Sequence, residues 1–148
     1  MITYQVESYR TSRDDELIEM HYQEIAPDKD HIPLDPDWAL YDALENSGNL
    51  VCFTARDDGK MIGYSVFILR YHLHYRTTKF AANDVIYVHP DYRKGTSVGR
   101  ELIKRSMQEL KEYGVTKVQW HVKLYQDWSP ILRRMGCVNE EILCSKIL

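Results

Sequence analysis

The side chains best suited to chemistry lie in one stretch, residues 84–103, with the sequence DVIYVHPDYRKGTSVGRELI. A short apolar run ends at His-Pro, the basic pair Arg93 and Lys94 follows, and a loop with two glycines and two hydroxyl side chains leads into an amphipathic segment. A turn from a strand into a helix leaves backbone N–H groups without partners at the helix N-terminus, where the helix dipole also favours negative charge. Cations beside such a turn predict a phosphate-binding site.

This stretch resembles the acyl-coenzyme A site of the GNAT (Gcn5-related) N-acetyltransferase superfamily. In that family a bulged strand and a V-x-P-x-Y-R segment precede an RxxGxG/A loop that opens a long helix, and the loop amides hold the pyrophosphate of the cofactor. The residues here that match are Val88, Pro90, Tyr92, Arg93 and Gly99. The resemblance therefore implies that acetyl-CoA is the cofactor.

The loop itself departs from the family spacing by one residue. Counted back from Gly99, Ser97 stands at the first glycine and Lys94 at the arginine. Counted forward from Arg93, neither glycine position holds a glycine. The resemblance assigns cofactor binding to the strand, the loop and the start of the helix, at Ile86, Tyr87, Val88, Arg93, Lys94, Gly95, Thr96, Ser97, Val98, Gly99 and Arg100.

Acyl transfer from a thioester to an amine needs a base for the ammonium, a donor for the tetrahedral oxyanion and a proton for the leaving thiolate. Asp84 begins the apolar strand, and the family often uses an acidic residue there as the general base. Capping the strand or pairing with an arginine are the alternative roles of Asp84, and His121 and His89 are further candidate bases. The resemblance gives the oxyanion to a backbone N–H of residues 86–88.

The general acid is the least defined of these groups. The family pattern L-Y-x-x-x-G-F corresponds to residues 131–137 (ILRRMGC), so Leu132 stands where the family usually has a tyrosine. Tyr125, about two helical turns earlier, is the substitute candidate, and its alternative role is to pack beside Trp128. Release of the thiolate without a dedicated acid is the remaining alternative.

No metal site is predicted. His72 and His74 would share one face of an extended chain, but no carboxylate or cysteine accompanies them, so we interpret the segment as a polar loop or the rim of an acceptor site. The three cysteines contain no C-x-x-C pair and leave one unpaired, which argues against disulfides and zinc. Filling of the core is their expected role.

Composition limits the class of protein. The 148 residues are 44% hydrophobic and 28% charged, typical of a soluble globular chain of one domain, residues 1–148. No apolar run reaches the roughly 20 residues of a membrane span, and the N-terminus lacks a signal-peptide core, so we expect a cytoplasmic protein. The net charge of −3 disfavours nucleic acid as a partner.

The periodicity of apolar residues and the turn signals predict the following order of elements. A strand at 2–9 precedes helices at 14–26 and 36–45. An Asp-Gly turn joins strands 50–56 and 61–71, and then come a strand at 79–88, a helix at 98–113, a strand at 117–123, a short helix ending near 135, and one or two last strands within 137–148.

This order resembles the GNAT fold, an α/β (α+β) architecture with a mixed central sheet of six to seven strands flanked by about four helices. The chain also looks like small members encoded by bacteriophages and prophages, which implies the cytoplasm of a host cell. The implied function is transfer of an acetyl group from acetyl-CoA to a primary amine of a small molecule, peptide or protein. A non-catalytic acyl-CoA-binding module acting through a protein partner is the alternative. The acceptor stays open, because variable loops such as 27–37 and 72–79 form its groove, and a homodimer stays open too.

Overall fold

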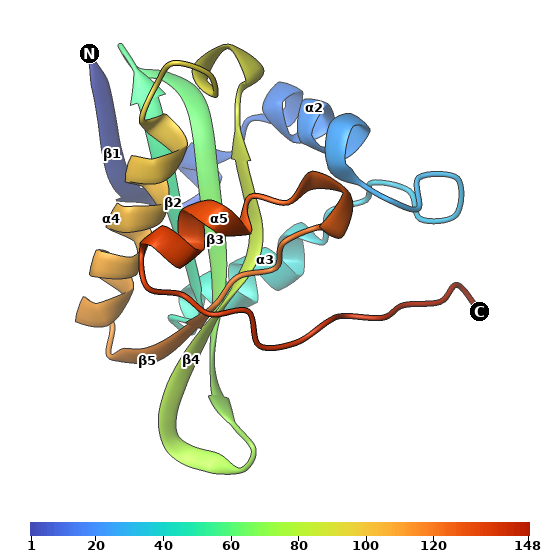
Figure 1. Cartoon of the computed structure of the whole chain (residues 1–148), viewed down its shortest axis with the longest axis vertical. Helices are drawn as coiled ribbons and strands as arrows, with labels where there is room; N and C mark the ends of the chain where they lie inside the picture. Colours follow the sequence, from blue (N-terminus) through green and yellow to red (C-terminus); the bar gives the residue numbers. More distant parts are fainter.

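The computed structural model describes residues 1–148, and its centre is one mixed sheet with the strand order β1-β2-β3-β4-β5 (Figure 1). Neighbouring strands from β1 to β4 are antiparallel, whereas β4 and β5 are parallel. A parallel pair requires a crossover connection, which a helix on one face of the sheet supplies. The strands are β1 (Ile2–Glu7), β2 (Leu50–Asp57), β3 (Lys60–His72), β4 (Tyr75–Val88) and β5 (Val115–Gln119).

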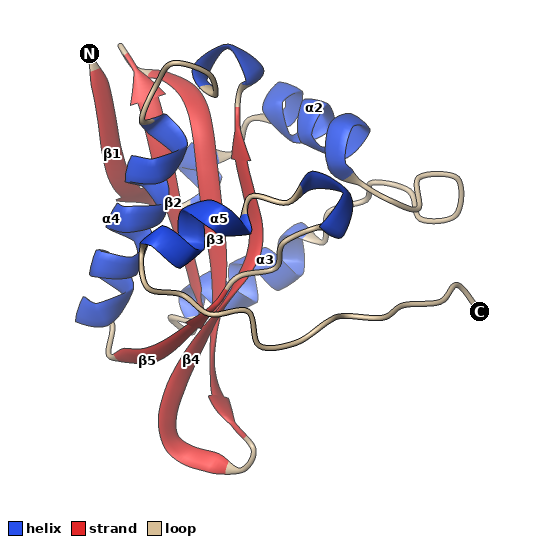
Figure 2. Cartoon of the chain, viewed as in Figure 1, coloured by secondary structure: helices blue, strands red, loops and turns tan.

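Helices cover both faces of this sheet (Figure 2). One face carries α4 (Val98–Glu112) and α5 (Ser129–Arg134), and the other carries α1 (Tyr9–Ser12), α2 (Asp15–Ile25) and α3 (Trp38–Asn46). Two short 3-10 helices, η1 (Pro90–Tyr92) and η2 (Leu124–Gln126), follow β4 and β5. Asp14 and Asp37 cap α2 and α3, because each carboxylate accepts a hydrogen bond from the backbone N–H three residues later. None of the helices is long and apolar enough to cross a membrane.

Each face of the sheet has its own apolar core, because successive side chains of a strand point to opposite faces. The core under α4 contains Val51, Phe53, Ala55, Ile62, Phe67, Leu69, Ala81, Val98, Leu102 and Leu110. The core under α1, α2 and α3 contains Tyr9, Leu17, Leu50, Cys52, Met61, Tyr64, Val66 and Tyr87. Burial on both faces explains why β2 and β3 are continuous apolar runs in the sequence.

The Asp-Gly hairpin between β2 and β3 is confirmed. Asp57 pairs with Lys60 across a two-residue loop, in which Asp58 has φ +47° and Gly59 has φ +87°. Positive φ at both central residues is the requirement of a type I′ turn, whose twist matches that of the strands. The β-hairpin therefore forms where the sequence predicts it.

A bulge in β4 opens the sheet beside this hairpin. Val85 pairs with Val66 and Asn83 pairs with Phe67, so Asp84 is an extra residue with no partner on β3. The amide nitrogen of Asn83 holds the distortion by donating to the Oγ of Ser65 at 3.1 Å. The parallel pairing of β4 with β5 ends at Ala82 and Gln119, just before the bulge. Beyond this point the two strands diverge and leave a gap in the sheet.

The prediction of six to seven strands is wrong, since the sheet has five. Residues 137–148 form no strand and run away from the body of the molecule as an extended tail (Figure 1). Ile142 and Leu143 in this tail are 74% and 82% exposed, because the fold offers them no apolar surface. Glu140 anchors the start of the tail through an ion pair of 2.8 Å with Lys117 of β5.

Two strand boundaries also differ from the prediction. The strand predicted at 117–123 ends at Gln119, because its partner β4 turns away and no ladder remains for the residues that continue the alternation. The loop predicted at 72–78 is instead the end of a long hairpin, since β3 continues to His72 and β4 starts at Tyr75. The tip of this hairpin projects from the sheet at the bottom of Figure 1, and no residue of it lines the main cavity described below.

Candidate active site

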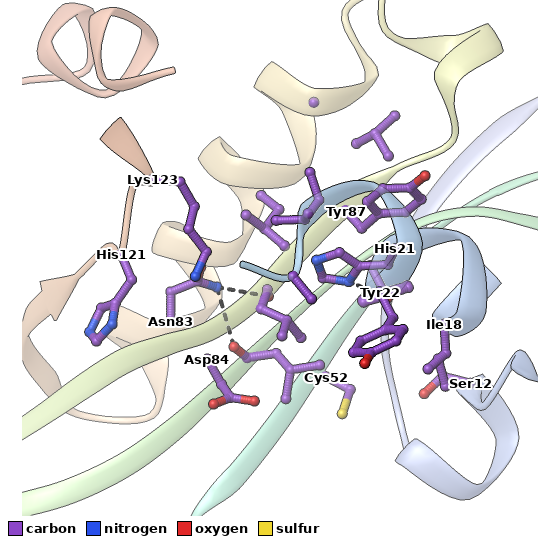
Figure 3. A pocket seen from close by; sticks show the side chains of 18 of the residues that line it. Ser12, Ile18, His21, Tyr22, Cys52, Asn83, Asp84, Tyr87, His121 and Lys123 are labelled. Atoms are coloured by element: carbon purple, nitrogen blue, oxygen red, sulfur yellow. Dashed lines mark hydrogen bonds between the residues drawn. The ribbon is translucent and has the colours of Figure 1, made fainter. Parts of the chain in front are cut away.

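A cavity of about 710 Å³ passes through the gap between β4 and β5. Residues of α4 and the loop before it line one end, and residues of α1, α2 and α3 line the other. The middle is formed by the segment of β4 from Asn83 to Val88. The cavity therefore connects the two faces of the sheet at the point where the β4 bulge separates the strands (Figure 3).

The N-terminus of α4 presents free hydrogen-bond donors at the first end. The backbone N–H groups of Ser97, Gly99 and Arg100 donate to no protein acceptor. The hydroxyl of Thr96 donates to the carbonyl of Tyr92, and its oxygen accepts from the N–H of Val98 at 3.4 Å. Free N–H groups at the positive end of a helix dipole suit an anion such as a phosphate.

The cavity contacts most of the residues predicted to bind the cofactor, but not all of them. The residues that line it are Ile86, Tyr87, Val88, Arg93, Thr96, Gly99 and Arg100. Lys94, Gly95 and Ser97 lie in the loop outside this lining, and the side chain of Val98 is 1% exposed within the core under α4. A Cβ atom at Gly99 would lie 3.9 Å from the Cγ2 of Val88, so the absence of a side chain keeps this end of the cavity open.

Arg93 does not point freely into the cavity. Its guanidinium forms a bidentate ion pair with Glu24 of α2, and its Nε donates to the carbonyl of Val88 at 2.7 Å. The hydroxyl of Tyr87 also donates to Glu24, at 2.7 Å. The hydrogen bond from Arg93 lowers the pKa of Glu24 to about 2 despite partial burial, so this carboxylate is ionised at neutral pH. The same cluster ties α2 to β4.

Asp84 and His121 lie on the two sides of the gap, on β4 and on the chain that leaves β5 (Figure 3). Asp84 is open to the cavity, but the walls around it exclude much of the water, and this burial raises its pKa. The nearby His121 opposes part of that effect. Lys123 extends toward Asn83 in the same gap. A carboxylate of raised pKa in a cavity is a candidate for proton transfer.

His21 of α2 forms a second polar group in the cavity. Its Nδ1 lies 2.7 Å from the hydroxyl of Tyr64, and its ring stacks on that of Tyr87 at 4.7 Å between centroids. Burial lowers the pKa of His21 to about 4, so the imidazole is neutral at pH 7. Burial also raises the pKa of Tyr87 to about 12, with a further contribution from Glu24.

Tyr125 and His89, the other candidates for proton transfer, lie outside the cavity lining. The hydroxyl of Tyr125 donates to the backbone carbonyl of Ile25 at 2.6 Å, which joins η2 to the end of α2. His89 accepts a hydrogen bond from the N–H of Asp91 at 3.3 Å and begins η1. Leu132 is buried in α5. The hydrogen bonds of Tyr125 and His89 favour structural roles for these two side chains.

Sequence reasoning missed His21, Glu24 and the aromatic side chains of α1 and α3 that line the cavity. His21 and Glu24 are three residues apart in a predicted helix, a spacing that places two side chains on one face. That spacing was the only signal, because the sequence does not show which strand the face packs against.

Comparison with known proteins agrees with this architecture. The model of the acetyltransferase (GNAT) family matches residues 15–131, which include the cavity-forming strands and α4. The chain belongs to the GNAT family. Acetyl-CoA is the acyl donor of this family, and the free donors at the start of α4 suit its phosphates. Among curated proteins, none matches the sequence significantly.

Solved GNAT structures share the fold at low sequence identity. An aminoglycoside acetyltransferase from an uncultured soil metagenomic sample has a TM-score of 0.76 at 14% identity, over 99% of this chain and 96% of that one. Glucosamine-6-phosphate N-acetyltransferase from Arabidopsis thaliana has a TM-score of 0.75 at 16% identity, over 99% and 98%. A predicted acetyltransferase from Clostridium acetobutylicum, solved with acetyl-CoA, has a TM-score of 0.68 at 15% identity, over 99% and 96%. Such identities establish a common fold and leave the acceptor of this GNAT protein undefined.

Proposed function

We propose that this GNAT protein transfers an acetyl group from acetyl-CoA to a primary amine. The observation that supports the proposal is the cavity through the sheet, which joins the free N–H groups of α4 to the carboxylate of Asp84. A thioester donor entering from the α4 side and an amine entering from the α2 and α3 side would meet in the gap between β4 and β5. Because the two substrates would enter from different sides, they would not compete for the same part of the cavity.

The residues at the α4 end fit the diphosphate of acetyl-CoA. The backbone N–H groups of Gly99 and Arg100, two residues that line the cavity, supply donors, and Gly99 leaves space for the phosphates. The side chain of Arg100 adds positive charge at the mouth of the cavity. Acetyl-CoA supplies the acetyl group activated as a thioester. The loop and the first turn of α4 hold and orient it.

Asp84 is the proposed general base. An alkylammonium has a pKa of about 10.4 and must lose a proton before its nitrogen can attack a carbonyl carbon. Desolvation by the cavity walls raises the pKa of Asp84 and makes it a stronger base than a carboxylate in open solvent. Backbone N–H groups of residues 86–88 of β4 are the proposed donors to the oxyanion. Tyr125 has no part in this proposal, because its hydroxyl donates a hydrogen bond to the backbone carbonyl of Ile25.

Release of free thiol from acetyl-CoA tests the proposal directly. The purified protein is incubated with acetyl-CoA and a panel of primary amines that includes alkylamines, arylalkylamines, polyamines, amino sugars and a lysine peptide. We expect amine-dependent thiol release together with the acetylated product, detected by mass spectrometry. Thermal stabilisation by coenzyme A without turnover on any amine would instead favour a non-catalytic acyl-CoA-binding module, which the buried Leu132 in place of a tyrosine also favours.

We also propose that two copies of the chain associate through the tail at 137–148. The tail exposes Val138, Ile142 and Leu143 in an extended segment, and the outer edge of β5 has no neighbouring strand. An extended apolar segment and an unpaired strand edge are complementary surfaces. Because each copy carries the tail and the unpaired edge of β5, a dimer with twofold symmetry would pair the tail of each copy with the β5 edge of the other.

A further inference from the structure

Three aromatic side chains form the far wall of the cavity, at the end opposite α4. We call Tyr9, Trp38 and Tyr41 the aromatic wall. The ring of Trp38 stacks on that of Tyr9 with 5.9 Å between the ring centroids, and the centroid of the Tyr41 ring lies 5.1 Å from each of the other two. Leu34 and Pro36, from the loop before α3, extend this apolar surface at the mouth of the cavity.

The charges of the cavity are unequal. Asp84 is the only carboxylate among the residues that line it. Of the cationic residues, Arg93 is paired with Glu24 and Arg100 lies at the α4 end, which leaves Lys123 in the gap beside Asn83 without an ion pair. Arg13 pairs with Asp15 and lies 4.1 Å from the ring of Trp38, which keeps it at the rim of the aromatic wall. A ligand with several positive charges would therefore find one anionic partner, Asp84, and one like charge, Lys123, in the gap.

Asp84 lies close to the aromatic wall. Asp84, Tyr41 and Trp38 line the same cavity, and the negative charge of Asp84 adds to the burial that raises the pKa of Tyr41. An amine whose nitrogen reaches Asp84 would extend its carbon skeleton over Tyr41 and Trp38. Contact with aromatic rings favours apolar and aromatic groups, because large rigid surfaces are removed from water at little cost in conformational entropy.

We propose that the acceptor is a primary monoamine with an apolar, preferably aromatic, body, bound with its nitrogen at Asp84 and its body on the aromatic wall. This inference rests on the proposed acetyltransferase function and defines its substrate class. The single carboxylate accepts one ammonium, and the remainder of the acceptor end is apolar. Polyamines and amino sugars lack the apolar surface that this wall would bury.

A homologous series of amines tests the class. We expect kcat/KM to rise from ethylamine to butylamine to hexylamine by about fourfold for each added methylene, the fold-change that corresponds to about 0.8 kcal/mol of burial. 2-Phenylethylamine should be used at least as well as hexylamine, and spermidine and glucosamine at least about tenfold less well. A flat series, or preferred use of the polyamine or the amino sugar, would overturn the proposed class while leaving the transferase activity intact.

Variants of the wall provide the second part of the experiment. Trp38→Leu should lower kcat/KM for 2-phenylethylamine by about tenfold or more, mainly through KM, with ethylamine changed by less than about twofold. Tyr71→Leu, at an exposed aromatic of β3 outside the cavity, is the matched control. Equal losses for both amines in Trp38→Leu would mean that the wall is merely structural.

Calorimetric binding separates this inference from the proposed function. Hexylamine and 2-phenylethylamine are titrated into the complex of the protein with coenzyme A, where no acetyl transfer takes place. Binding of these amines, with spermidine and glucosamine bound at least about tenfold more weakly, would support the acceptor class even if thiol release failed on every amine. Absence of binding by the apolar amines would overturn the class whatever the result of the turnover assay.

Discussion

At the scale of single residues, the position of Asp84 depends on the bulge in β4, in which Asp84 is the extra residue. The bulge removes this residue from the ladder with β3, and its side chain lies in the cavity at the gap (Figure 3). The neighbouring Asn83 is 1% exposed and uses its amide to hold the backbone of the bulge. A carboxylate placed by a bulge is fixed in position and still open to a substrate.

Asp84→Asn should lower kcat by roughly 10²–10⁴-fold, because the amide cannot accept the proton of the ammonium. Binding of coenzyme A should be almost unchanged, since Asp84 lies away from the N-terminus of α4. Steady-state rates and calorimetric affinity measure the two effects. Asp91→Asn, at an exposed carboxylate outside the cavity, is the control. A wild-type kcat in Asp84→Asn would remove this carboxylate from the mechanism.

His21 makes stability depend on pH. Its pKa falls from 6.5 to about 4 on folding, so between these values the unfolded chain binds a proton that the folded chain does not. Stability is therefore lost as the pH falls from about 6.5 to about 4, by up to about 3 kcal/mol at 1.36 kcal/mol per pKa unit. Urea unfolding at several pH values measures this loss. His21→Gln should flatten the profile in this window, with His31→Gln, on the exposed loop after α2, as the control. An identical slope in His21→Gln would contradict the assignment.

At the scale of elements, the junction of the loop and α4 determines where an anion can bind. Val98, Leu102 and Leu110 fix the helix against the core of the sheet, so its first turn cannot move away from the cavity. Gly95, with φ +72°, lets the chain reverse direction within the short loop between η1 and α4. The free N–H groups are consequently held by packing and not by a ligand.

Gly99→Glu should reduce the affinity for coenzyme A by at least about a hundredfold, because the carboxylate occupies the cavity and repels phosphates. Gly99→Ala should retain binding, since its Cβ would meet Val88 at an ordinary distance of 3.9 Å. Gln108→Glu adds the same charge at an exposed site further along α4 and controls for net charge. Calorimetry with coenzyme A measures all three. Equal affinities for Gly99→Glu and Gln108→Glu would exclude a phosphate site at this turn.

At the scale of the whole molecule, the cavity exists because two halves of the fold meet across the sheet. The segment before β2 supplies the aromatic wall and His21, while the segment after β4 supplies the anion-binding turn. The ion pair between Glu24 and Arg93 connects the two halves at the cavity. Only the tail at 137–148 stands outside this arrangement (Figure 1).

Removal of residues 137–148 should convert a dimer into a monomer, and it should leave the unfolding temperature almost unchanged at concentrations so low that both proteins are monomeric. The reason is that the apolar side chains of the tail are exposed within one copy and contribute little to its own core. Sedimentation velocity of the full chain, the truncated chain and Leu143→Glu measures the association. A full-length protein that sediments as a monomer at about 100 μM would contradict the proposed pairing.

The sequence by itself determined the local structure of this GNAT protein. The apolar runs of β2 and β3, the Asp-Gly turn, the helices α2 and α3 and the loop before α4 all depend on neighbouring residues, and each forms close to its predicted place. Periodicity and turn chemistry act over a few residues, so a single sequence is sufficient to detect them. The extra residue at Asp84 and the truncated β5 were not visible, because a bulge and the end of a ladder depend on the partner strand.

The tertiary structure alone decided which distant side chains meet in the cavity. Glu24 and Arg93 are 69 residues apart, and His21 and Tyr64 are 43 apart, so no local pattern connects them. The packing of α2 on the sheet brings both pairs together, and the aromatic wall of α1 and α3 lines the same cavity as Asp84. The tail at 137–148 has the sequence pattern of a strand but pairs with no edge within its own copy. A sequence pattern is not sufficient, because a strand forms only when its backbone hydrogen-bonds to a neighbouring strand.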